Sequence, residues 1–277
     1  MVFEALYSPQ LILRRKGFDF LLGFVFSIFG MAAGLFLFPR DPSLVAIAFI
    51  AILLLPSVVA MIKIQRDVIH KAKNLKVALL SSKDLLVTYL LIFLGILLAF
   101  GVFAILLPNI VTSHLFATQV SVLQETHTDY TAGFGEFRPI FMNNLRVFAV
   151  TLAVALMFGT GGVFIITWNA SVFGTIFGII AKSQAALTSS SPVAGFVNFA
   201  IIVAVVLPHM VLEASAYSFA GITGGIVSDS IEVRDRKIYN RLFKYAGSLI
   251  ALSFCLLLLA AAVEAEISPV FAGLFLS

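Results

Sequence analysis

Charged residues are scarce in this 277-residue chain, because Asp, Glu, Lys and Arg make up 12% of it and hydrophobic residues 61%. Soluble proteins average about 25% charged and about 45–50% apolar residues. With a mean hydropathy of +1.08, a water-soluble fold would leave much apolar surface in water. The composition excludes a soluble enzyme and a nucleic-acid-binding protein, and it predicts an all-α polytopic membrane helix bundle of about six to seven transmembrane segments.

Cysteine is almost absent, and the common catalytic motifs are missing. Cys255 is the sole cysteine and lies in the last apolar run, which excludes an intramolecular disulfide framework. The sequence contains no GxSxG, P-loop, GxGxxG or HExxH motif. We therefore predict a non-enzymatic protein with no catalytic residues, no metal and no cofactor.

Long apolar runs predict a single integral membrane domain over residues 1–277, in which 1–17 form an interfacial N-terminal segment. Five runs predict one crossing each: Phe18–Phe38, Leu44–Ile62, Leu85–Leu107, Val147–Trp168 and Tyr245–Val263. Polar residues interrupt the region Asn169–Ser228, so its crossings depend on the orientation of the chain.

The basic residues indicate that orientation. Fourteen of the eighteen Lys and Arg residues lie in three segments, at 14–16, 63–83 and 234–244. Lys and Arg are retained on the cytoplasmic side of the cell membrane. We therefore predict that the N-terminus lies on the cytoplasmic side, and that the outer loop 109–144 and the C-terminus with Glu264 lie on the outer side. The fourth apolar run then ends on the cytoplasmic side, and the segment that leads into Arg234 also ends there. An even number of membrane crossings must therefore lie between Trp168 and Arg234.

Two crossings fit this region, one over Asn169–Leu187 and a return over Val193–Val227. As one straight helix the return would measure about 52 Å at about 1.5 Å per residue, whereas a bilayer core is about 30 Å thick. Proline kinks helices because it removes a backbone donor. We therefore predict that the return is broken or re-entrant near Pro208.

The predicted cytoplasmic connection 63–84 is amphipathic. Its apolar residues, among them Val68, Ile69 and Leu75, fall on one helical face, and Lys71 lies largely on the other. Such a helix can lie at the level of the lipid headgroups or pack on the bundle, and the pattern fits both.

Ionisable residues inside a membrane are costly and mark candidate functional sites. His209 and Glu213 lie one helical turn apart, and Tyr217 continues the same face. With Asn169 and Asn198 they form a predicted buried polar centre that handles ions, protons or a polar group of a substrate or partner. The alternative is a hydrogen-bonded group that locks the broken helix to its neighbours. An intramembrane metallohydrolase is a weaker hypothesis, because catalytic zinc usually has three protein ligands.

Glycine pairs spaced by four residues predict close helix packing, because they let backbones approach in lipid. Three pairs lie in apolar segments: Gly30 and Gly34, Gly174 and Gly178, Gly221 and Gly225. Packing within one chain is the favoured use, and a dimer contact is the other. We also predict a homo-oligomer, a dimer in the first place.

Several motifs in the C-terminal half resemble the stage II sporulation protein M family. They are Asn143-Asn144, Trp168-Asn169, Gly174, Pro208-His209, Glu213 and Ala220-Gly221. The resemblance covers the family-like core 141–225, with Ala170 and Met210 where the family often has glycine. It implies a polytopic membrane protein without known catalytic residues, whose namesake works in a complex with two peptidoglycan-degrading partners.

Two functions from different classes follow. The leading hypothesis is a non-enzymatic scaffold or complex subunit in envelope remodelling, with the lipid bilayer and other membrane or envelope proteins as partners. The alternative is a channel or transporter with a polar site at His209 and Glu213, because discontinuous helices at membrane depth commonly build such sites.

Overall fold

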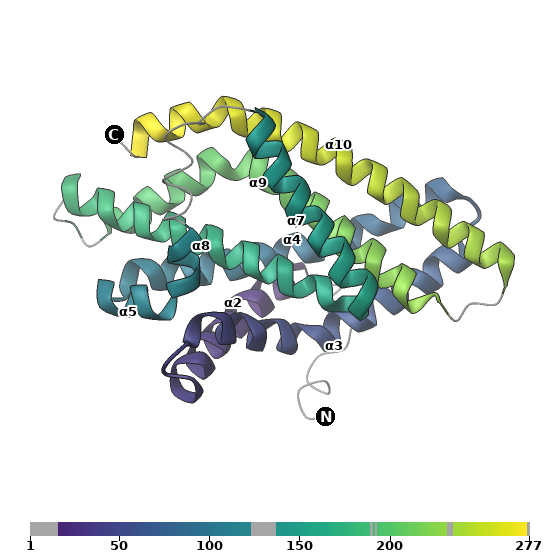
Figure 1. The fold of residues 1–277 in the computed structure, drawn as a ribbon, viewed down its shortest axis with the longest axis horizontal. Helices are drawn as coiled ribbons and strands as arrows, with labels where there is room; N and C mark the ends of the chain where they lie inside the picture. Colours follow the sequence, from purple (N-terminus) through teal and green to yellow (C-terminus); the bar gives the residue numbers. More distant parts are fainter. Residues whose placement is uncertain (1–15, 123–136, 189–190, 192, 232–234, 276–277) are drawn as a thin grey trace.

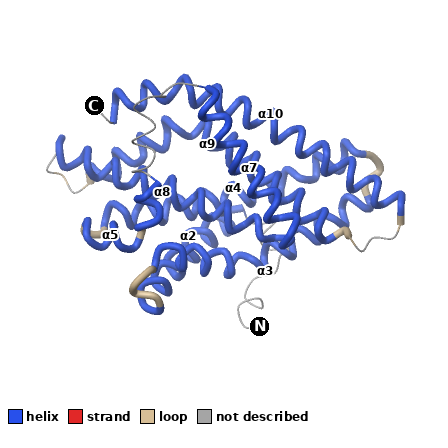
Figure 2. Tube along the Cα trace, in the orientation of Figure 1, coloured by secondary structure: helices blue, strands red, loops and turns tan. Residues whose placement is uncertain are grey.

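A computed structural model describes residues 16–122, 137–188, 191, 193–231 and 235–275. The interfacial segment 1–17, Arg14, Arg15, Arg234 and the middle of the outer loop therefore fall wholly or mostly outside the described residues. Within the described ranges the chain is helical and has no strand, which confirms the predicted fold class (Figure 2). The helices are α2 (Lys16–Leu37), α3 (Pro42–Lys71), α4 (Leu75–Leu106), α5 (Asn109–Leu115), α7 (Phe137–Phe158), α8 (Gly162–Thr188), α9 (Ala194–Asp229) and α10 (Arg236–Phe275).

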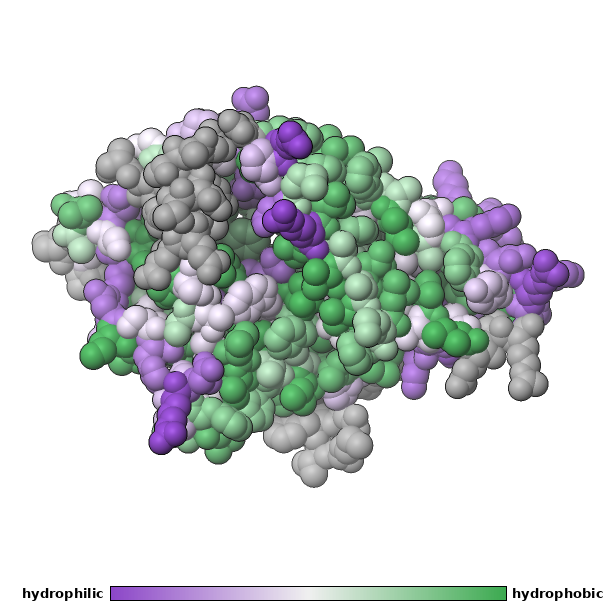
Figure 3. Space-filling model, viewed as in Figure 1, coloured by the Kyte–Doolittle hydropathy of each residue, from purple (hydrophilic) through white to green (hydrophobic). Residues whose placement is uncertain are grey.

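Six stretches of these helices are long and apolar enough to cross a membrane. Most of the helices run along the long axis of the molecule (Figure 1). On the face shown in Figure 3 an apolar surface covers much of the middle, and hydrophilic residues gather toward both ends, most of all at the right-hand end, where α3, α4, α9 and α10 meet. This banded surface is typical of a protein whose middle lies in lipid.

One apolar stretch, 137–188, consists of two helices rather than one. The predicted fourth crossing, Val147–Trp168, is wrong in its boundaries, because α7 ends at Phe158 and a 3-10 turn over Gly159–Gly161 leads into α8. Gly159 has a φ of +63°, which only glycine adopts freely. The GTGG sequence therefore reverses the chain and is not buried inside a crossing. Two helices, α8 and α9, follow this turn and precede the segment at Arg234, so the predicted even number of crossings is retained.

The predicted break at Pro208 is absent, because α9 is one α-helix from Ala194 to Asp229 with Pro208 inside it. Proline removes one hydrogen bond from a helix, and membrane helices tolerate this. Pro208 lies on an exposed face of α9. Another face of the N-terminal half packs on α4, because a methyl group on Gly101 of α4 would lie 2.2 Å from the ring of Phe199, and one on Gly195 would lie 3.1 Å from Ile105.

The connection 63–84 is not a separate helix at the headgroups. It consists of the last turns of α3, a short turn and the first turns of α4, where Asn74 caps α4 by accepting a hydrogen bond of 2.9 Å from the Val77 N–H. Gln65, Ile69 and Ala78 are buried. Much of the apolar face recognised in the sequence thus packs on the bundle, whereas Val68 is exposed.

Glycines set the spacing of two helix pairs. A methyl on Gly30 would lie 2.4 Å from Ile50, and one on Gly34 2.7 Å from the Pro42 carbonyl, so α2 touches α3 there. A methyl on Gly174 would lie 2.3 Å from the Leu97 carbonyl, and one on Gly178 2.7 Å from the Gly101 carbonyl, so α8 lies directly on α4. Gly221 and Gly225 are looser, with methyl distances of 3.4 Å to Ile166 and 3.3 Å to Ile62. All six glycines face helices of their own chain.

The ends of the helices agree with alternating crossings. At one end Arg66 of α3 forms an ion pair of 2.5 Å with Asp229 at the end of α9. Lys63 and Gly159 line a small cavity with Asp229, which places the α7–α8 turn at the same end. This end carries the basic connections, and the prediction that it faces the cytoplasm stays a prediction.

Candidate functional site

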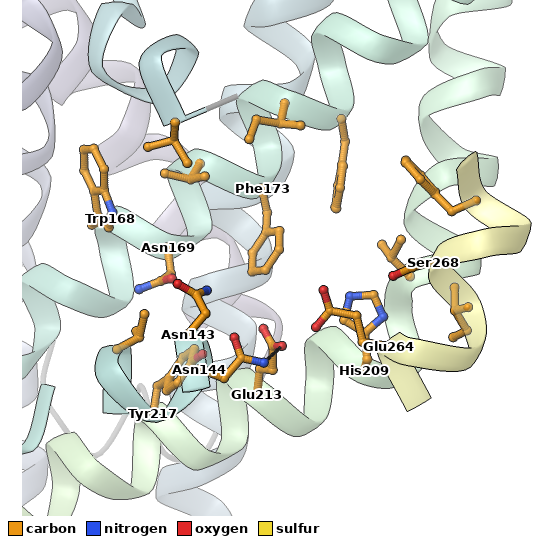
Figure 4. Close-up of a pocket in the computed structure, with 18 of the residues that line it drawn as sticks. Asn143, Asn144, Trp168, Asn169, Phe173, His209, Glu213, Tyr217, Glu264 and Ser268 are labelled. Atoms are coloured by element: carbon orange, nitrogen blue, oxygen red, sulfur yellow. Dashed lines mark hydrogen bonds between the residues drawn. The ribbon is translucent and has the colours of Figure 1, made fainter. Parts of the chain in front are cut away.

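A cavity of about 330 Å³ lies between α7, α8, α9 and α10. One part of its wall is polar and comes from all four helices (Figure 4). Another part is aromatic, with Phe173 and Phe177 of α8 and Phe271 of α10. We call this space the acidic cavity, because its ionisable residues include two glutamates. Its polar lining residues are Asn143, Asn144, Trp168, Asn169, His209, Glu213, Tyr217, Glu264 and Ser268.

The middle of α9 supplies the predicted centre. Because His209, Glu213 and Tyr217 are spaced by four residues, one face of α9 brings all three to the cavity. Their side chains are well shielded, with exposed fractions of 6%, 3% and 2%. The continuous helix through Pro208 keeps this spacing helical on both sides of His209. A broken helix is thus not needed to build the site.

Asn144 and Glu264 complete a carboxyl cluster that sequence reasoning missed. Asn144 Nδ2 donates a short hydrogen bond to Glu213 Oε1 and so joins α7 to α9. Glu264 of α10 lines the same cavity as Glu213. The acidic cavity therefore brings two carboxyl groups and an amide together from three helices.

The structure places Glu264 inside a helix. The sequence predicts that Glu264 follows the last crossing, because the apolar run ends at Val263. In the structure α10 continues to Phe275, and Glu264 lies within this helix and lines the cavity. A signal is present in the sequence, because Ile267, Ser268 and Phe271 follow Glu264 at helical spacing and all line the cavity. Asn144 lies well inside α7 and is buried, and its hydrogen bond to Glu213 links α7 to α9.

The two asparagines of the predicted polar centre, Asn169 and Asn198, lie in different parts of the structure. Asn169 lines the cavity, and its Nδ2 donates to the Ile165 carbonyl at 2.8 Å. Asn198 does not belong to the site, because its Nδ2 lies 3.5 Å from the Ala181 carbonyl, on the helix pair α8 and α9. It lies nearly three turns before His209 on α9, too far along the helix to share the centre.

A sequence model of the Stage II sporulation protein M family matches residues 20–269. The chain belongs to this family. No curated protein and no solved structure shows significant similarity to it. The match covers every membrane-spanning helix of this family member at least in large part, and it confirms the resemblance seen in residues 141–225.

The residues that carry the resemblance gather at the acidic cavity of this Stage II sporulation protein M family chain. Asn143, Asn144, Trp168, Asn169, His209 and Glu213 all line it. Gly174 instead packs α8 on α4, and Ala170 and Met210, at positions where the family often has glycine, are buried. The motif thus combines cavity-lining polar groups with packing positions.

One cavity-lining group lacks a protein partner. His209 Nδ1 is buried and makes no hydrogen bond within the described part of the protein. Buried polar atoms are nearly always paired, so an orphan beside a cavity indicates a site that a ligand or water completes. In the described ranges no cluster of three or more His, Cys, Asp or Glu side chains is arranged to hold a metal ion. The arrangement suits the binding of polar groups and the exchange of protons.

Proposed function

We propose that this family member is a transporter-type membrane protein that binds a small polar or charged solute in the acidic cavity and passes it across the bilayer. One observation carries this proposal: the side chains of His209, Glu213 and Glu264 line an open volume beside the middle of α9. Polar groups at this depth are expensive, and they recur where solutes, ions or protons move through membranes. A dry helix contact would have filled the volume with side chains.

The second candidate function is a scaffold or complex subunit in envelope remodelling. Family membership favours it, since the family's namesake works in a complex with peptidoglycan-degrading partners. In a scaffold the acidic cavity would be a by-product of packing, and water-soluble reagents would not need to reach it. Access to the cavity therefore separates the two functions.

The experiment measures access with cysteines on α10. In a Cys255→Ser background, Ser268→Cys places a thiol on the cavity wall, and Ser253→Cys is a matched control that is buried and bonded to the Leu249 carbonyl at 2.8 Å. Each variant is reconstituted in sealed vesicles and treated with a charged, membrane-impermeant thiol reagent from either side. Transport requires a site that opens to both sides in turn, so Ser268→Cys should react from both sides and Ser253→Cys from neither.

Two outcomes would count against transport. Reaction of Ser268→Cys from one side only would leave a binding site without a transport pathway. Protection of Ser268→Cys from both sides, to the level of Ser253→Cys, would show a dry cavity and favour the scaffold.

A further inference from the structure

The ionisable groups of the acidic cavity are anionic or neutral. The titratable residues on its wall are Glu213, His209 and Tyr217 from α9 and Glu264 from α10, and no Lys or Arg lines it within the described residues. The cations of the adjoining helices are turned elsewhere. Lys182 of α8 donates to the Leu107 carbonyl at 2.5 Å, and Arg138 and Arg146 of α7 are exposed and not part of the wall. An anion would meet carboxyl groups with no counter-charge, whereas a cation would be neutralised.

The hydrogen-bonding groups narrow the class of cation. Two carboxyl groups, the amide oxygens of Asn143 and Asn144 and the hydroxyl of Ser268 offer several acceptors around one space. A primary ammonium has three N–H donors and no acceptor, so it can use several of these oxygens at once. A bare metal ion fits less well, because no cluster of three ligating side chains is preformed in the described residues.

The opposite wall suits an apolar body. The ring of Phe173 lies 5.6 Å from that of Phe177, and Phe177 lies 6.5 Å from Phe271, each measured between ring centroids. These three rings form a continuous aromatic wall, and Trp168 also lines the cavity. Aromatic faces bind apolar groups and attract nearby cations. The cavity volume of about 330 Å³ is at the small end for ligand pockets.

From this arrangement of acids and rings we propose that the acidic cavity binds an amphipathic organic ammonium, with the cationic group at Glu213 and Glu264 and the apolar body on the aromatic wall. The inference rests on the proposed function only in that transport of the ammonium across the bilayer needs access from both sides, whereas binding does not.

Trp168 gives a built-in test of binding, because it is the only tryptophan and lines the cavity. The purified full chain in lipid nanodiscs is titrated with 2-phenylethylammonium, 2-phenylethanol and phenylacetate, which share one aromatic body and differ in charge. Only the ammonium should change the tryptophan fluorescence with saturation, and the alcohol should bind at least about tenfold more weakly.

Matched variants on α10 locate the effect. Glu264→Gln should weaken ammonium binding at least about tenfold, whereas Glu266→Gln, two residues on and exposed, should behave like the unmodified chain. If Glu264→Gln does not fold, as judged by its melting temperature, Glu213→Gln provides the same test on α9.

The results separate the two proposals. Equal binding of alcohol and ammonium, or stronger binding of phenylacetate, overturns the cation site, while two-sided reactivity of Ser268→Cys would still support transport. Ammonium binding, combined with one-sided reactivity of Ser268→Cys, keeps the cation site and overturns transport.

Discussion

Two of the polar clusters buried in the helix bundle are built in opposite ways. The closed cluster consists of Gln65 of α3, Ser81 and Ser82 of α4 and Tyr245 of α10. Gln65 Nε2 donates to Ser81 Oγ at 3.0 Å and lies 3.3 Å from Ser82 Oγ and Tyr245 Oη. The Ser82 and Tyr245 hydroxyls are 2.6 Å apart. In the acidic cavity, by contrast, His209 Nδ1 has no partner and the polar groups border open volume.

The difference in hydrogen bonding between the two clusters indicates which one stabilises the fold and which one is a candidate functional site. Polar groups in a bundle stabilise it when they satisfy one another, and the closed cluster does this while joining three helices. It contains no ionisable carboxyl or imidazole group. The acidic cavity holds two acids and an imidazole that packing alone does not satisfy, which is costly unless water, protons or a ligand complete the site.

The largest effect on stability is expected at Tyr245 in the closed cluster. Tyr245 is fully buried, so Tyr245→Ala removes a large side chain and leaves Gln65 and Ser82 short of a partner. We expect a loss of about 3–5 kcal/mol in the free energy of unfolding, measured by thermal or denaturant unfolding in detergent. Tyr239→Ala, on the exposed face of the same helix, is the control and should change stability by less than about 1 kcal/mol.

A smaller effect on stability is expected at Glu213 in the acidic cavity. Glu213→Gln keeps the shape and an acceptor for Asn144, and it removes a buried ionisable group. The free energy of unfolding should change by no more than about 1 kcal/mol, although ammonium binding should be lost. A drop in stability as large as that of Tyr245→Ala would make Glu213 a structural residue and erase the contrast between the clusters.

The smallest effect is expected at the ion pair between Arg66 and Asp229. Both side chains are partly exposed, at 27% and 30%, so solvent screens the pair. Asp229→Asn should cost at most about 1 kcal/mol and leave both clusters intact, as measured by unfolding and by ammonium binding. An effect on binding would show that the helix ends are coupled to the acidic cavity.

Hydropathy and spacing predicted much of this structure from sequence alone. Apolar runs predicted the membrane helices, and the four-residue spacing of His209, Glu213 and Tyr217 predicted their shared face. Hydropathy failed at Gly159, because a turn made of glycine and threonine does not lower the apolar average of its surroundings. The prediction of a break at Pro208 failed because a proline inside a membrane helix does not have to end it, and α9 is continuous.

Glu264 and Asn144 escaped prediction for a different reason. Each lies beside the polar end of an apolar run, where a charged or amide side chain is ordinarily solvated. Only the lengths of α10 and α7 and the way they pack on α9 turn these residues inward. The carboxyl pair joins residues 51 positions apart in the sequence, so tertiary packing alone could reveal it.

The central claim is that the acidic cavity is wet and the closed cluster dry, and one quenching measurement compares them directly. Acrylamide, a neutral water-soluble quencher, is added to the chain in nanodiscs, where Trp168 is the only tryptophan. A second protein, Trp168→Phe with Tyr245→Trp, moves the tryptophan to the closed cluster and is used if its melting temperature matches that of the unmodified chain. A wet acidic cavity and a dry closed cluster predict strong quenching at position 168 and little at position 245. Equal protection at both positions would contradict it.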